Sequence, residues 1–153
     1  MKVLIVGPAL SGKDTACRML AELTGLRFRG GTSVAIGESK GWGLEHRREN
    51  RKLWFDAGRE LCKSDPAFLV RAMLADADIT NGCRALEEII VTRIENLVDH
   101  VVWIERPGCD DSSLEFGSGF ADYVVLNTGT LEGLRRSMVA LARLLELPCT
   151  SRY

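Results

Sequence analysis

The start of the chain constrains the fold most, because three structural signals follow one another there without a gap. Residues 2–6 form a short apolar run rich in β-branched side chains, which is typical of a buried parallel strand. A glycine-bearing segment, residues 7–13, follows at once. Residues 14–23 then have the composition of a helix, with Leu20 and Leu23 on one face. The order strand, glycine loop and helix predicts the first unit of an α/β domain.

The glycine-bearing segment has the spacing of a phosphate-binding loop: glycine, four residues, glycine, lysine. Glycines let the backbone turn tightly and direct N–H groups onto a ligand rich in oxygen, and the helix start adds unpaired N–H groups with a partial positive charge. We therefore expect Gly7, Ser11, Gly12 and Lys13 to bind the phosphates of ATP. The plainer alternative is a glycine-bearing turn that carries a surface lysine.

The residue after the lysine departs from the usual loop, in which Ser or Thr holds magnesium. Asp14 stands there and Thr15 follows one place later. A carboxylate at this position can bind Mg²⁺ or accept a proton from a hydroxyl group. It is also simply favourable at a helix start. We expect Asp14 and Thr15 to form the metal site, and Lys13 and Asp14 to be catalytic.

Composition limits the class of protein. The 153 residues predict a single domain over residues 1–153, and the formal net charge of −1 confines any nucleic-acid site to a local patch. The five cysteines are odd in number and include no C-x-x-C pair. They predict reduced thiols in the cytoplasm, with no disulfide partner. Residues 1–7 match neither a signal peptide nor a membrane span, so we expect no membrane association.

Strand-like and helix-like segments alternate along the rest of the chain, which predicts a three-layer α/β fold. We expect a parallel sheet of about five strands with helices on both faces. The expected strands are residues 2–6, 26–29, 77–80, 100–105 and 122–126. The expected helices are residues 14–23, 45–62, 66–75, 85–97 and 130–146. Residues 34–44 are predicted to form a mobile loop or a broken helix, and residues 106–121 a loop rich in glycine and serine.

Ligands of such sheets collect beyond the carboxyl ends of the strands. This rule brings residues 7–13, Ser33, residues 81–84, Arg106 and residues 127–129 to one rim. Asp76 and Asp78 lie at the opposite end of their strand, so we do not expect them to be ligands. Asp110 and Asp111 are predicted to belong to a solvated loop.

Basic and aromatic residues suggest where an acceptor would bind. Arg47 and Arg51 are four residues apart on a predicted helix and Trp54 lies near the same face, so they could hold an anion and stack on a base. Trp42, between glycines, could stack in the same way. The alternatives are a solvated helix face and a tryptophan that packs its loop down.

Arg84 follows a predicted strand end beside a glycine, where its side chain would face the phosphates. Glu88, four residues later, could hold that guanidinium as an ion pair. We expect Arg84 to be catalytic.

The chain resembles the bacteriophage deoxynucleoside monophosphate kinases and their small phage relatives. The resemblance covers nearly the whole chain, and its first and last motifs are the most specific. The matching motifs are Ser11-Gly12-Lys13-Asp14-Thr15; Arg47, Arg51 and Trp54; Asp65-Pro66 with Arg71; Gly82-Cys83-Arg84 with Glu88; and Ala121-Asp122 with Asn127, Gly129, Thr130 and Leu131.

The resemblance implies an ATP- and Mg²⁺-dependent kinase in which Asn127 and Gly129 border the adenine. It places Ser33, Trp42, Arg47, Arg51, Trp54, Arg71 and Glu88 on the acceptor side. The chain departs from the larger relatives in two ways. It has Gly82 where they have an acidic residue, which removes one magnesium ligand. Related kinases also have a mobile lid with several arginines, whereas the corresponding residues 106–121 of this chain contain a single arginine, Arg106.

A shortened lid suits a bulky acceptor. One phage subgroup of similar kinases phosphorylates 5-hydroxymethyl-deoxyuridine within DNA, in the host cytoplasm, and this is the acceptor we expect. The alternatives are a kinase of free deoxynucleoside monophosphates and a nucleotide-binding module without catalysis.

Overall fold

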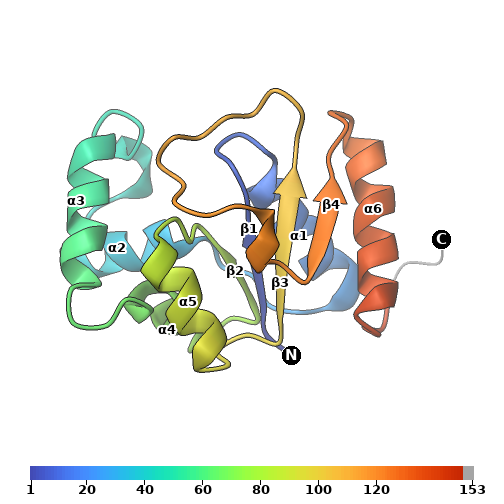
Figure 1. Ribbon diagram of the computed structural model, residues 1–153, viewed down its shortest axis with the longest axis horizontal. Coiled ribbons are helices and arrows are strands. Elements are labelled where there is room, and N and C mark those ends of the chain that lie inside the picture. The colour runs from blue at the N-terminus through green and yellow to red at the C-terminus, as the bar shows by residue number, and fades with distance from the viewer. Residues whose placement is uncertain (150–153) are drawn as a thin grey trace.

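The computed structural model describes residues 1–149, which form a parallel sheet covered by helices on both faces (Figure 1). Within these residues the sheet has four strands in the order β2-β1-β3-β4. The strands are β1 (Val3–Val6), β2 (Ile79–Asn81), β3 (His100–Glu105) and β4 (Tyr123–Leu126). The helices are α1 (Lys13–Thr24), α2 (Thr32–Lys40), α3 (Arg51–Leu61), α4 (Phe68–Leu74), α5 (Leu86–Ile94) and α6 (Leu131–Leu144), with short 3₁₀ turns at Leu44–His46 and Ser118–Phe120. The predicted fold class is confirmed.

The strand expected over residues 26–29 makes only one bridge, between Phe28 and Ile79, so the sheet has one strand fewer than we expected. The backbone explains the difference. The carboxylate of Asp78 accepts the N–H of Arg27, a bond that a regular ladder would give to a carbonyl oxygen. Gly30, at φ 127°, then turns the chain away.

Residues 34–44, expected to be a mobile loop or a broken helix, largely belong to α2, which ends at Gly41 in the left-handed conformation. Gly37 in this helix is a packing position. A Cβ atom there would lie 2.8 Å from the carbonyl oxygen of Trp42 and 3.1 Å from the ring of Trp54. Tertiary packing therefore outweighs the poor helix propensity of glycine.

The core lies on the two faces of the sheet. One cluster joins β1 to α1 and α6 and includes Ile5, Leu20 and Met138. The other joins the opposite face to α4 and α5 and includes Leu4 and Trp103. No helix of the described part of the chain is both long and apolar enough to cross a membrane. The layers leave the carboxyl ends of the strands as the edge at which loops gather.

Replacing Met138 by Ala is expected to lower the free energy of unfolding by about 2–5 kcal/mol, because the side chain is fully buried between α6 and α1. Replacing Leu144, on the same helix but 64% exposed, should cost less than about 1 kcal/mol. Urea denaturation of both variants measures the difference. Equal losses would contradict this account of the core.

Candidate active site

The loop between β1 and α1 depends on two glycines. Gly7 has φ 149°, and a Cβ atom there would lie 2.6 Å from the carbonyl oxygen of Ile104 on β3. Gly12 has φ 98°, and its Cβ would lie 2.7 Å from the side-chain amide nitrogen of Asn127. Both positions combine a left-handed backbone with a close neighbour, so any larger residue would displace the loop. The loop therefore lies at the carboxyl edge of the sheet, as the sequence predicts.

Asn127, just after β4, holds the loop between β1 and α1 in place. Its buried side chain donates to the carbonyl oxygen of Ser11 at 2.8 Å and accepts from the N–H of Gly129 at 3.1 Å. The structure thus gives Asn127 a role behind the loop. The expected contact of Asn127 and Gly129 with an adenine stays a prediction.

Lys13 begins α1 and points back over the loop, where its Nζ donates to the carbonyl oxygen of Pro8 at 2.7 Å. Burial and the nearby Arg84 lower the pKa of Lys13 to about 8. The hydroxyl group of Ser11 is fully buried and has no hydrogen-bond partner among the described residues. The desolvated ammonium group of Lys13 fits a site that an anion completes.

Asp14 extends from the first turn of α1 toward β2, where Asn81 Nδ2 donates to its Oδ1 at 2.8 Å. Asn81 is buried at the end of β2 and also contacts Cys17. Sequence reasoning placed residue 81 at the rim without a role. The structure makes it the residue that orients Asp14.

The described residues contain no cluster of three or more acidic, histidine or cysteine side chains that could hold a metal ion. Mg²⁺ commonly takes one or two protein ligands together with phosphate oxygens and water. Asp14 and Thr15 beside the loop fit that role.

A pocket of about 460 Å³ opens beside Asp14. Three arginines from separate elements line it: Arg18 of α1, Arg29 of the segment before α2, and Arg47 after the 3₁₀ turn. The guanidinium of Arg47 donates to Ser33 Oγ, which also lines the pocket, at 2.6 Å. The remaining lining residues are Phe28, Gly30, Gly31, Val34 and Leu44. Three cationic side chains and one carboxylate give this pocket the chemistry to bind an anion.

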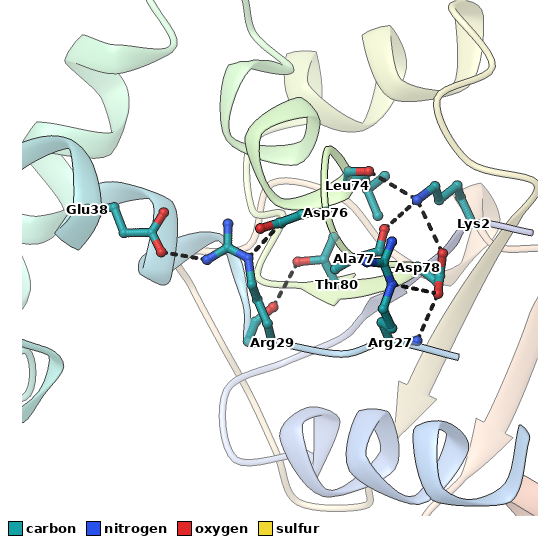
Figure 2. A network of polar contacts seen from close by, with 10 residues as sticks. Lys2, Arg27, Arg29, Glu38, Leu74, Asp76, Ala77, Asp78 and Thr80 are labelled. Carbon is teal, nitrogen blue, oxygen red and sulfur yellow. Dashed lines mark hydrogen bonds and ion pairs between the residues drawn. The ribbon is translucent and has the colours of Figure 1, made fainter. Parts of the chain in front are cut away.

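A polar network fixes the pocket wall around Arg29 (Figure 2). Arg29 is held by ion pairs with Glu38 of α2, at 2.5 Å, and with Asp76, at 2.7 Å. Thr80 of β2 donates to the carbonyl oxygen of Gly30 at 3.0 Å. Asp76, which we did not expect to bind a ligand, thus orients one of the pocket arginines.

The adjoining part of the same network anchors the chain before the pocket. Asp78 pairs with Lys2 at 3.3 Å and accepts the backbone N–H of Arg27 at 2.8 Å (Figure 2). These bonds hold the start of β1, the entry to β2 and the segment that carries Arg29 in one place.

Sequence reasoning missed Arg18 and Arg29. Arg18 lies four residues after Asp14 and so shares its face of α1, a spacing that the sequence contains. Arg29 reaches the pocket only because the segment 26–31 leaves the sheet, which no local pattern indicates.

Of the seven expected acceptor residues, Ser33 and Arg47 line the pocket and the other five do not. Trp54 is 5% exposed and packs edge-on against Trp42, with ring centroids 5.4 Å apart, so the expectation that it stacks on a base is wrong. Arg71 pairs with Asp65 and with Glu95, which lies just past the end of α5, the end that leads into the start of β3.

Other expected acceptor residues lie elsewhere. Arg51 is exposed at the start of α3, and Trp42 is half-buried against Trp54. Glu88 is buried, which raises its pKa to about 6, and it accepts the backbone N–H of Arg84 at 3.1 Å. The expected side-chain ion pair between Arg84 and Glu88 is thus replaced by a backbone bond.

The guanidinium of Arg84 pairs instead with Asp111, at 2.5 Å. The side chain of Asp111 is only 8% exposed, so the expectation of a solvated loop there is wrong. Arg106, at the start of the same segment, donates to the carbonyl oxygen of Leu10 at 3.2 Å. The segment after β3 therefore closes over the phosphate loop.

No protein-family model and no curated protein matches the sequence. Several solved structures resemble the whole chain. A shikimate kinase from Bacteroides thetaiotaomicron aligns over 96% of this chain and 99% of its own, with a TM-score of 0.62 and 14% identity. The chain has the fold of the P-loop kinases.

Two further structures agree. A shikimate kinase from Acinetobacter baumannii in complex with shikimate has a TM-score of 0.61 and 16% identity over 95% of this chain and 93% of its own. A sugar kinase from Janibacter sp. HTCC2649 has a TM-score of 0.55 and 17% identity over 95% of this chain and 94% of its own. At these identities the likeness concerns the fold, and membership of a phage subgroup stays a prediction.

Replacing Asn127 by Ala is expected to leave the carbonyl oxygen of Ser11 unpaired and to lower the free energy of unfolding by about 1–3 kcal/mol. The looser loop should also bind ATP more weakly. Lys63→Ala, at an exposed position outside the loop and the residues around it, should change neither property. Thermal unfolding and calorimetric titration with ATP measure both effects. Unchanged ATP affinity in the Asn127 variant would contradict the role given to this side chain.

Proposed function

We propose that this protein is a phosphotransferase that transfers the γ-phosphoryl group of ATP to a small anionic acceptor. One observation carries the proposal: Asp14, in the helix turn that directly follows the phosphate loop, also lines the arginine-lined pocket. A donor and an acceptor bound in these two places would meet at Asp14. Such positioning, with electrostatic stabilisation, is the main contribution of a protein to phosphoryl transfer.

The donor side would use Lys13 and the loop amides, that of Ser11 among them, to hold the outer phosphates. Asp14 and Thr15 would hold Mg²⁺, which when bound neutralises phosphate charge. Arg84, close enough to Lys13 to lower its pKa, would stabilise charge on the transferring group.

The acceptor side would hold an anion through Arg18, Arg29 and Arg47. A volume of about 460 Å³ is in the range of small-molecule sites. Fixed guanidinium groups are what a free monophosphate or carboxylate requires. A deoxynucleoside monophosphate therefore fits this pocket better than the interior of a polymer does. One of the similar kinase structures likewise contains a small hydroxylated acid, shikimate.

An oxygen of the acceptor attacks the γ-phosphorus of ATP, the bond from this phosphorus to the β–γ bridging oxygen breaks, and ADP leaves with that oxygen. If the attacking group is an alcohol, Asp14 accepts its proton. If it is a phosphate, no proton need move.

The second candidate acceptor is 5-hydroxymethyl-deoxyuridine in DNA. Exposed Arg48, Arg51 and Lys52 adjoin Arg47 at the pocket and could hold DNA phosphates. Binding of this kind would weaken steeply as the salt concentration rises, whereas binding of one small anion would weaken much less.

Incubation with labelled ATP and either mixed deoxynucleoside monophosphates, small hydroxylated acids, unmodified DNA or DNA with 5-hydroxymethyl-deoxyuridine tests these proposals. We expect label in a small acceptor. Lys13→Ala should abolish transfer, because the first turn of α1 has no other lysine to bind the phosphates. Lys63→Ala, at an exposed position, should not. Label in the modified DNA alone would replace the first acceptor by the second. ATP binding without transfer to any of these would leave a nucleotide-binding module.

Replacing Arg47 by Ala is expected to raise the KM for a small acceptor about tenfold or more, because the acceptor would lose a charge-assisted bond to this guanidinium group of the pocket lining. Arg48→Ala, at the exposed next position, is the matched control and should leave this KM unchanged. Steady-state kinetics with saturating ATP measures both. Equal effects of the two variants would favour a DNA acceptor, which spans several cations.

A further inference from the structure

Residues 106–117 form a long loop after β3, at the same end of the sheet as the loop after β1 (Figure 1). Its central contact is the carboxylate of Asp111. The backbone N–H of Ala9, inside the phosphate loop, donates to Asp111 Oδ2 at 2.9 Å. Arg84 Nη1 donates to the same oxygen at 2.5 Å. A side chain from more than a hundred residues away thus caps the loop.

The carboxylate of Asp111 occupies the position of an anionic ligand. It is bound by a loop amide and by the arginine proposed to act on the transferring phosphoryl group, and it lies near enough to Lys13 to raise the pKa of that ammonium group. Burial acts to raise the pKa of Asp111, but bonds from Ser113, Arg84 and Ala9 outweigh it and hold this pKa far below its usual range. The group is therefore a permanent anion between two cations.

The loop is built to hold Asp111 in this place. Ser113 donates to Asp111 Oδ1 through its backbone N–H, at 3.0 Å, and through its hydroxyl group, at 2.5 Å. Beyond it, Phe116 is buried between Trp103 and Phe120, at centroid distances of 6.3 and 5.9 Å. This aromatic cluster anchors the far end of the loop to the core.

The part of the loop before Asp111 has no comparable packing against the core. Residues 105–108 are exposed, and Gly108 has φ 80° with open space around it. At the near end the contacts are single bonds, from Arg106 and from the thiol group of Cys109 to the carbonyl oxygen of Leu10. Beyond Asp111, Leu114 packs against the core and the N–H of Glu115 donates to the carbonyl oxygen of Arg84 at 2.9 Å. The segment up to Asp111 can therefore move while the residues from Leu114 onward stay in place.

We propose that Asp111 is a latch that competes with the outer phosphates of the donor nucleotide for Ala9 and Arg84. The inference rests on the proposed donor site and goes beyond it. Without nucleotide the carboxylate satisfies the loop amide and the guanidinium. Binding of a nucleoside triphosphate displaces the carboxylate and transfers Arg84 to the phosphate. This competition lowers the affinity for ATP and keeps the empty site closed.

Calorimetric titration of the full-length protein with ATP and with AMP tests the latch. Asp111→Asn should tighten ATP binding about tenfold or more, because a neutral amide oxygen holds Ala9 and Arg84 more weakly than the carboxylate does, and these bonds are then easier to break. AMP, whose single phosphate does not reach the latch, should bind as it does to the wild type. Asp110→Asn, an adjacent exposed position with the same change of charge, is the control and should have no effect.

Ser113→Ala separates the latch from a general effect of charge. It removes the bond that Ser113 Oγ donates to Asp111 and the bond, at 2.8 Å, that this oxygen accepts from Arg84 Nη1, without altering the charge. Both bonds hold the latch closed, so the variant should tighten ATP binding about twofold or more. Hydrogen exchange over residues 107–113 should rise in both the Asp111 and the Ser113 variants before nucleotide is added.

Unchanged or weaker ATP binding in Asp111→Asn would overturn the latch, as would equal tightening by Asp110→Asn or no effect of Ser113→Ala. Tightening of AMP to the same degree would also overturn it. If neither the wild type nor Asp111→Asn bound ATP, the proposed donor site would fail and the latch with it. A result that removes the latch alone leaves wild-type ATP binding intact, so the two failures are distinguishable.

Discussion

The close contact of the loop after β1 with Ile104 of β3 and with Asn127, just after β4, is the constraint on which the site depends. The carbonyl oxygen of Ile104 leaves no room for a side chain at position 7, and the amide of Asn127 leaves none at position 12. The chain between them must therefore turn back tightly and enter α1 with its amides gathered at one point. Lys13 adds a desolvated cation at that point, so an anion is the natural complement.

The arginine-lined pocket is built in a different way, largely from segments that have little regular structure. Its arginines come from a helix, an irregular segment and a turn, and ion pairs rather than a sheet ladder hold the wall. The carboxylates that perform this task, Asp76 and Asp78, lie at the amino end of β2, far along the strand from the phosphate loop. Charges at the opposite edge of the sheet thus shape the site without taking part in it.

Local patterns predicted the layers, the phosphate loop and the carboxyl-edge location of the site, because strand–loop–helix order and glycine spacing are properties of adjacent residues. They failed where distant contacts decide. Trp54 lies beside arginines in sequence, but packing against α2 buries it. Asp111 belongs to a polar, glycine-rich stretch that is indistinguishable from a solvated loop until the fold brings it to Ala9 and Arg84. Glu88 has the right spacing from Arg84, yet accepts its backbone N–H.

The central claim is that the amides at the start of α1 hold the outer phosphates of a nucleotide. Backbone amide NMR during titration with ADP measures this directly, residue by residue. The account predicts the largest shift changes at residues 11–15, which form the end of the loop and the first turn of the helix. Small changes there, with the largest at the exposed edge formed by β4 and α6, would contradict it.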